Sequence, residues 1–160
     1  KSLTYAQYPG AVESYPKKTA DEVETAIRGG NIVFIDEFES TKICKDINTL
    51  TSFTVEKHKE YSKNRVMRVL NQLCNDLYKN YSLYYIGKVD NNPTGRELLR
   101  GWVIGYLNEM QANNGIQDFT AEDVTVAPGQ ESDTVVITIA IMPVDSVEVV
   151  YATVNVRTIA

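Results

Sequence analysis

The chain has 160 residues, of which 43% are hydrophobic, and this length and composition suit one globular domain with its own core. Asp and Glu number 21 against 16 Lys and Arg, and the resulting net charge of −5 argues against general nucleic-acid binding, which normally requires a basic surface. No apolar run approaches 18 residues, so the sequence predicts no membrane insertion.

The chain begins with an extended segment and a short helix. Residues 1–18 contain Tyr, Pro and Gly without a clear period, which predicts an extended segment whose aromatic side chains pack on the domain. Thr19 and Glu22 have the spacing of a capping box, and Gly29-Gly30 is typical of a helix end. We therefore expect a helix between Thr19 and Gly29.

A hairpin is predicted next. Residues 32–35 are all apolar, which predicts a strand buried on both faces. Residues 36–41 predict a polar turn, and residues 42–47 alternate well enough to be the return strand. The acidic residues of this turn are interpreted as solvated, and not as a paired-carboxylate site; they are Asp36, Glu37 and Glu39.

Two long amphipathic helices are predicted in the middle of the chain. The first spans about residues 62–81, and its apolar stripe is Val66, Val69, Leu70, Leu73 and Leu77. The second begins at Asn92-Pro93, a natural N-cap and N1 pair, and ends at Asn114-Gly115. Its stripe is Leu99, Trp102, Val103, Tyr106, Leu107 and Met110, which we interpret as core.

A basic cluster precedes and opens the first long helix. Around His58 it comprises Lys57, Lys59, Lys63, Arg65 and Arg68. One interpretation is a solvated helix face, and the other is a docking surface for an acidic partner. The sequence alone leaves both open.

The C-terminal part of the chain predicts β-structure. A short strand is expected at residues 124–126, followed by a β-ribbon over residues 133–159 with two runs, 134–142 and 147–159, separated by Pro143 and polar turn residues. The first run has large β-branched residues at its odd positions, which predicts one buried face; they are Val135, Ile137, Ile139 and Ile141.

The end of the second run stays apolar on alternate residues, which is unusual for a chain end. The residues concerned are Val149, Val150, Tyr151, Ala152, Thr153, Val154, Asn155, Val156 and Arg157. Ordering a residue costs roughly 1–2 kcal/mol in backbone entropy, and a valine returns about 1.5–3 kcal/mol only when it is buried. Such a strand either closes onto its own sheet or joins the sheet of a neighbouring copy, and we favour the neighbour.

The sequence shows no group of residues typical of catalysis or ligand binding. His58 is the only histidine, and Cys44 and Cys74 lack the spacing of a metal site. Neither a phosphate-binding loop nor a nucleophile–base spacing is present. We therefore expect no enzyme activity, no cofactor and no metal, with both cysteines reduced and partly buried.

Hairpins with helices inserted between them predict the α+β class: an antiparallel or mixed β-sheet with two long helices packed on one face, plus a C-terminal β-arm. We divide the chain into the extended segment at residues 1–18, an α+β domain at residues 19–148 and a strand arm at residues 149–160.

Five stretches spread over nearly the whole chain carry a family resemblance. They are LTYAQYPGAV (residues 3–12), DINTLT (46–51), KNRVMRVL (63–70), YIGKV (85–89) and AIMPVD (140–145). In this order they resemble the C-terminal domain of contractile tail sheath proteins, above all those of myophages, prophages and phage-tail-like bacteriocins of Gram-positive bacteria.

The resemblance implies a structural subunit and not an enzyme. Many copies would stack as rings around a rigid inner tube, and the sheath would shorten to drive that tube through a target envelope. The C-terminal domain would lie innermost, the arm at about residues 149–159 would donate a strand to a neighbouring subunit, and an N-terminal arm of another subunit would complete the sheet. The basic cluster from Lys57 to Arg68 would contact the tube or a neighbouring ring.

The same resemblance implies the partners and the place of assembly. The partners would be other copies of the chain, the inner tail tube protein and the baseplate, with no nucleic acid and no membrane insertion. Assembly would occur in the bacterial cytoplasm, and the product would be a virion or a released phage-tail-like particle.

Members of this family are much longer, with an N-terminal arm and outer domains ahead of the matching region. We therefore expect the chain to lack that donor strand and to be a fragment or the ordered part of a larger subunit. Two other interpretations stay open: a monomeric α+β adaptor that binds an unrelated protein by β-strand addition, and an enzyme with an unrecognised site.

Overall fold

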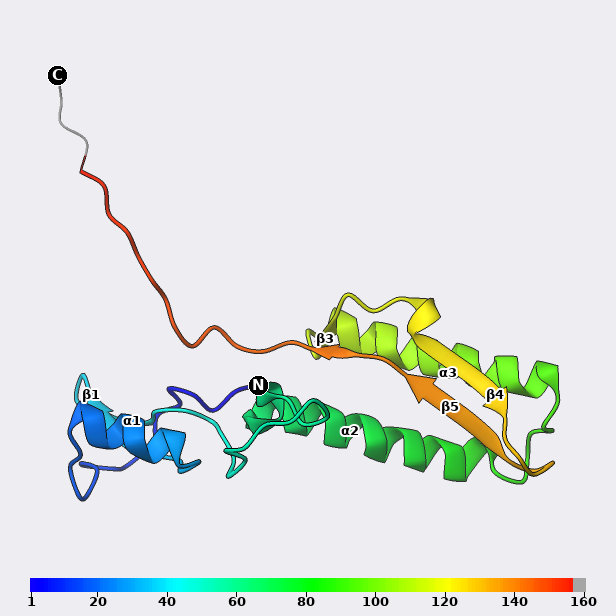
Figure 1. Ribbon diagram of the computed structural model, residues 1–160, viewed down its shortest axis with the longest axis horizontal. Coiled ribbons are helices and arrows are strands. Elements are labelled where there is room, and N and C mark those ends of the chain that lie inside the picture. The colour runs from blue at the N-terminus through cyan, green and yellow to red at the C-terminus, as the bar shows by residue number, and fades with distance from the viewer. Residues whose placement is uncertain (157–160) are drawn as a thin grey trace.

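The computed structural model describes residues 1–156: a short helix and a hairpin come first, two long helices follow, and the remaining strands come after them (Figure 1). The helices are α1 (Ala20–Arg28), α2 (Asn64–Asn80) and α3 (Pro93–Ala112), with a π-helical turn at Tyr81–Tyr85 and 3-10 turns at Lys59–Ser62 and Ala121–Asp123. The strands are β1 (Phe34–Glu37), β2 (Ser40–Ile43), β3 (Ile116–Gln117), β4 (Val124–Pro128), β5 (Val135–Ile139) and β6 (Met142–Pro143). The α+β class is confirmed, although the strands of the described residues form three two-stranded sheets, β1-β2, β3-β6 and β4-β5, and not one continuous sheet.

Local sequence signals determine the helix ends. The Thr19 side chain accepts a hydrogen bond from the Glu22 amide, and the Glu22 carboxylate accepts one from the Thr19 amide at 2.8 Å, so the predicted capping box is present. The Asn92 side chain accepts from the Gly95 amide at 2.8 Å and caps α3. Asn114, just after α3, has a φ of 56°, the left-handed conformation that ends many helices.

The first hairpin differs from its prediction in both register and burial. Its turn consists only of Phe38 and Glu39, which both have positive φ, so the residues predicted as a longer polar turn belong partly to β1 and β2. Residues 32–35 are not buried on both faces, because Val33 is buried whereas Ile32 and Phe34 are exposed. A groove beside β1 leaves part of this apolar run open to solvent. An uninterrupted apolar run was therefore not enough to predict a strand buried on both faces.

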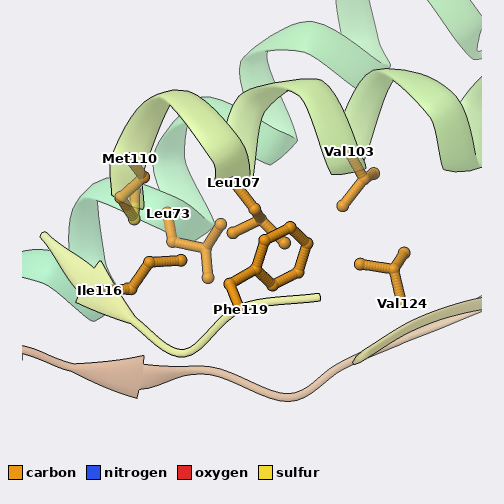
Figure 2. Close-up of a cluster of buried hydrophobic side chains, with 7 residues drawn as sticks. All are labelled: Leu73, Val103, Leu107, Met110, Ile116, Phe119 and Val124. Atoms are coloured by element: carbon orange, nitrogen blue, oxygen red, sulfur yellow. The ribbon is translucent and has the colours of Figure 1, made fainter. Parts of the chain in front are cut away.

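The core lies between the two long helices and the strands that follow them (Figure 2). Its buried side chains come from α2, α3, β3, β4 and the loop between the two strands: Leu73, Val103, Leu107, Met110, Ile116, Phe119 and Val124. Residues of both predicted helix stripes therefore contribute to one core, Leu73 from the first and Val103, Leu107 and Met110 from the second.

Aromatic side chains extend the contact between α2 and α3 toward the π-helical turn. The Trp102 ring stacks on Tyr106 at a centroid distance of 5.7 Å and meets Tyr81 edge-on at 5.8 Å. The Tyr106 hydroxyl donates to Asp76 Oδ2 at 2.6 Å. Burial raises the pKa of Tyr81 to about 12, because the ionised phenolate would lose its hydration in this aromatic cluster.

The strands near the C-terminus do not form the predicted ribbon. β5 pairs with β4 from Val124–Ile139 to Pro128–Val135, and β6 pairs with β3. The first C-terminal run therefore has its partner earlier in the chain, and the second run contains no strand as far as residue 156. The ribbon prediction was wrong because alternation in β5 identifies a buried face but not the strand that pairs with it.

Candidate functional site: the C-terminal arm and its base

The C-terminal arm, residues 149–156 in the described part of the chain, extends away from the body of the molecule (Figure 1). All of these residues are exposed; Tyr151 exposes 95% of its surface and Val156 exposes 90%. Within residues 1–156, no backbone hydrogen bond joins the arm to the rest of the chain. The predicted arm residue Arg157 and those after it lie outside the described residues.

The base of the arm, residues 144–148, is held against the start of α2 and the end of α3. The Val144 amide donates to the Gly115 carbonyl at 3.0 Å, and the Val144 carbonyl accepts from Arg65 Nε at 2.7 Å. Lys63 pairs with Glu148 and lies 3.7 Å from the Asp145 carboxylate. The chain is thus fixed up to Glu148, and the exposed arm begins at the next residue.

Thr4 joins the N-terminal segment to the same carboxylate. Its hydroxyl donates to Glu148 Oε1 at 2.9 Å and accepts from the Asp46 amide at 3.0 Å. Since Lys63 bonds the other carboxylate oxygen, both oxygens of Glu148 have a partner. The Glu148 side chain is only 7% exposed, although it lies in a segment that is otherwise leaving the domain.

Asp46 makes a second buried connection to the N-terminal segment. It is 3% exposed, accepts from the Leu3 amide at 2.8 Å and from Asn64 Nδ2 at 3.0 Å, and pairs with Arg68. Burial raises the pKa of Asp46, but hydrogen bonds from Arg68, Leu3 and Asn64 outweigh it and hold the pKa below its ordinary value. This pairing therefore stabilises the fold above the ordinary carboxyl pKa, and the stabilisation is lost as the pH falls through the lowered pKa.

The structure divides the predicted basic cluster into two groups. Lys63, Arg65 and Arg68 bind partners within the chain, namely Glu148, the Val144 carbonyl and Asp46. Lys57 and Lys59 are exposed and form no ion pair within residues 1–156. Sequence reasoning missed the acidic partners because they are far along the chain, Glu148 being 85 residues from Lys63.

A groove of about 1290 Å³ lies beside the arm base, between α1, β1 and the loop of residues 44–53. Its lining is partly apolar and includes Val23, Ile27, Phe34, Ile35, Leu50 and Phe53, and Glu148 and Val149 lie at one side of it. β2 has backbone hydrogen-bond partners on both of its edges. β1 pairs with one edge, and residues 5–8 pair with the other, where the Tyr8 amide, for example, donates to the Thr41 carbonyl at 2.9 Å. β1 has a backbone partner on one edge only within the described residues.

Comparison with known proteins decides the family. A family model described as "Phage tail sheath C-terminal domain" matches residues 56–157, which is more than half of the chain. The chain belongs to this phage tail sheath family.

Solved sheath structures share the fold. A sheath tail protein from Desulfitobacterium hafniense is 38% identical and superposes with a TM-score of 0.83 over 92% of this chain and 34% of its own. A sheath tail protein from Listeria innocua is 27% identical, with a TM-score of 0.80 over 92% of this chain and 36% of its own. The likeness therefore includes most of the first 55 residues, which the family model does not match.

Two Bacillus subtilis proteins are similar over 98% of this sheath chain. The uncharacterized protein YqbK is 33% identical, and the phage-like element PBSX protein XkdK is 29% identical. The chain spans 36% of the length of each relative, so it corresponds to about a third of those proteins.

The described part of the sheath chain contains no group of three His, Cys, Asp or Glu side chains that could hold a metal ion. His58 is exposed, Cys44 is half-buried, and Cys74 is exposed and not partly buried as expected. Among residues 1–156, no helix has both the length and the apolar character needed to cross a bilayer.

Proposed function

We propose that this chain is the C-terminal part of a structural, non-catalytic sheath subunit that polymerises around an inner tube and contracts to drive the tube through a target envelope. The observation that carries the proposal is the exposed arm, residues 149–156, which has alternating apolar residues and no backbone partner within residues 1–156. Membership of the tail sheath family supports the same role. Assembly in the bacterial cytoplasm, into a virion or a phage-tail-like particle that also has a baseplate, is part of this proposal.

The arm acts by adding a strand to the sheet of a second copy. An extended segment gains backbone hydrogen bonds when it pairs with an open strand edge, and its apolar side chains gain burial when that edge lies beside an apolar surface. The β1 edge meets both requirements, because the groove at β1 contains Val23, Ile27, Leu50 and Phe53. We therefore assign β1 of one subunit as the edge that receives the arm of another.

Removing residues 150–160 from the full-length protein is expected to abolish the formation of tubes or rings, because each subunit then loses the strand that joins it to the next. Negative-stain electron microscopy and sedimentation measure the result. The truncated protein is expected to keep its thermal unfolding midpoint, since the described part of the deleted segment makes no backbone contact with the domain.

A matched control replaces residues 150–160 with a glycine–serine segment of equal length, which keeps the chain length and removes the apolar pattern. This control is expected to fail in assembly as the truncation does. Normal tubes from both variants would contradict strand addition, and normal monomers from the unaltered full-length protein would favour an adaptor that binds an unrelated protein.

Lys57 and Lys59 form the proposed contact with the inner tube, because Lys63, Arg65 and Arg68 already bind groups within the chain. Reversing both charges, with Lys57→Glu and Lys59→Glu, is expected to weaken binding of purified tube protein about tenfold at low salt, the effect of losing two exposed ion pairs. Co-sedimentation at two salt concentrations measures it.

Lys79→Glu with Lys88→Glu provides the control for this charge reversal. Both lysines are exposed and lie elsewhere, so the net charge changes equally without altering the proposed contact. Equal binding by the two double variants would exclude Lys57 and Lys59 as the tube contact.

A further inference from the structure

We propose that Thr4, Lys63 and Glu148 form an arm anchor, a positioning device that sets the direction in which the arm leaves the domain and couples the arm to residues 2–4. The inference rests on the proposed function only where it predicts an effect of the anchor on tube assembly. The coupling itself is a property of one chain and can be measured in one chain.

The first observation is the contrast in burial along the arm base. Val147 is 85% exposed and Val149 is 57% exposed, whereas the Glu148 side chain between them is 7% exposed. One carboxylate thus turns inward from a segment that is otherwise open to water. A buried carboxylate is retained in such a place only when its oxygens are paired, and here each oxygen has a partner, Thr4 for Oε1 and Lys63 for Oε2.

The second observation is that the anchor completes a two-point attachment. Arg65 and the Gly115 carbonyl hold Val144 through its two backbone groups, and Lys63 holds Glu148 four residues later. Two fixed points define a direction, whereas a single point leaves the segment free to pivot. Without the bonds of Lys63 and Thr4 to Glu148, the pivot moves back from residue 149 toward residue 144.

The third observation is that the anchor includes the other end of the described chain. The Thr4 hydroxyl accepts from Ser2 Oγ at 3.0 Å and from the Asp46 amide at 3.0 Å, and it donates to Glu148. A displacement of residues 2–4 therefore removes a partner from Glu148, and a pull on the arm acts on Thr4. The two segments are 144 residues apart in sequence and share one carboxylate.

Spin-label distance measurements on the full chain test the anchor. Labels at Val147→Cys, an exposed site at the arm base, and at Asn71→Cys, an exposed site on α2, are introduced with Cys44→Ser and Cys74→Ser. The distance distribution is expected to be narrow in the otherwise unaltered chain. It should widen at least about twofold with Lys63→Met or Glu148→Gln, and by less with Thr4→Val, which removes one hydroxyl.

Matched controls are available for each substitution. Lys79→Met, Glu122→Gln and Thr138→Val change exposed residues of the same types and are expected to leave the distribution unchanged. A label pair at Asn71 and Thr125 reports whether a variant keeps its fold. An unchanged distribution in folded Lys63→Met and Glu148→Gln would overturn the anchor, and so would equal widening in the control variants.

Electron microscopy of full-length Glu148→Gln then separates this inference from the proposed function. Because the arm itself is intact, the variant is expected to form tubes that are shorter and less regular, whereas truncation of the arm abolishes them. If truncation leaves assembly unchanged, the proposed function fails, and the spin-label result still decides whether the anchor exists.

Discussion

Replacing Leu107 with alanine is expected to lower the free energy of unfolding by about 3–5 kcal/mol. Leu107 is fully buried and lies near the centre of the core, next to Leu73 and Phe119 (Figure 2). Removing its branched end leaves a cavity among side chains of a close-packed core. Hydrogen bonds from Tyr106 to Asp76 and from Arg100 to the Val124 carbonyl join α3 to α2 and to β4, so these elements cannot move freely to fill it. Since a domain is stable by roughly 5–15 kcal/mol, this single change removes a large part of the total.

Urea unfolding, followed by the fluorescence of the only tryptophan, Trp102, measures this loss. Leu98→Ala is the matched control, because Leu98 lies on the same helix but is 59% exposed. We expect it to change the free energy of unfolding by less than about 0.5 kcal/mol. Equal losses for the two variants would show that α3 does not bury the face assigned to it.

The helices of this protein were predictable because their signals are local. The capping box at Thr19 and the Asn92-Pro93 pair each act within one helical turn, so the sequence alone contains the cause of the structure. The stripe from Leu99 to Met110 likewise identifies a buried face without naming its partner. What packs on that face is decided by distant residues such as Ile116 and Val124.

The strand pairing was not predictable for the opposite reason. Val135 to Ile139 has the alternation of a strand with one buried face, but a period of two does not say which strand lies beside it. The sequence placed this run in a ribbon with the run that follows, and the structure pairs β5 with β4, which precedes it. The division into three small sheets likewise depends on how distant segments pack against one another, which cannot be predicted from a local sequence pattern.

The candidate site shows the same limit. The apolar end of the chain and the basic cluster were both visible in the sequence, but the link between them was not. Lys63 and Glu148 meet only because α2 and the chain after β6 lie side by side, as the bond between Arg65 and the Val144 carbonyl also shows. The one available signal for such an anchor was Glu148, a single charged residue between Val147 and Val149. A charged residue in an apolar run is rarely buried unless it is paired.

Replacing Val150 and Val154 with aspartate in the full-length protein is expected to abolish assembly as completely as removing the arm. Both side chains lie on the even-numbered face of the arm and are exposed in the single chain, at 77% and 85%. When that face is buried in a neighbouring subunit, each valine side chain contributes about 1.5–3 kcal/mol to the binding of the arm. Losing both therefore lowers the affinity of one subunit for the next by roughly 10² to 10⁴. Two buried carboxylates add a further cost, because taking a charge out of water without a paired partner is unfavourable.

The odd-numbered face provides a control of equal charge and length. Thr153→Asp with Asn155→Asp is expected to leave tubes intact, because a strand that buries one face keeps the other wet. Both double variants are expected to unfold at the same temperature as the unaltered protein, since all four residues are exposed in the single chain. Equal loss of assembly on the two faces would mean that the arm does not bind as a one-faced strand, and tubes from the valine variant would mean that the arm does not join the subunits.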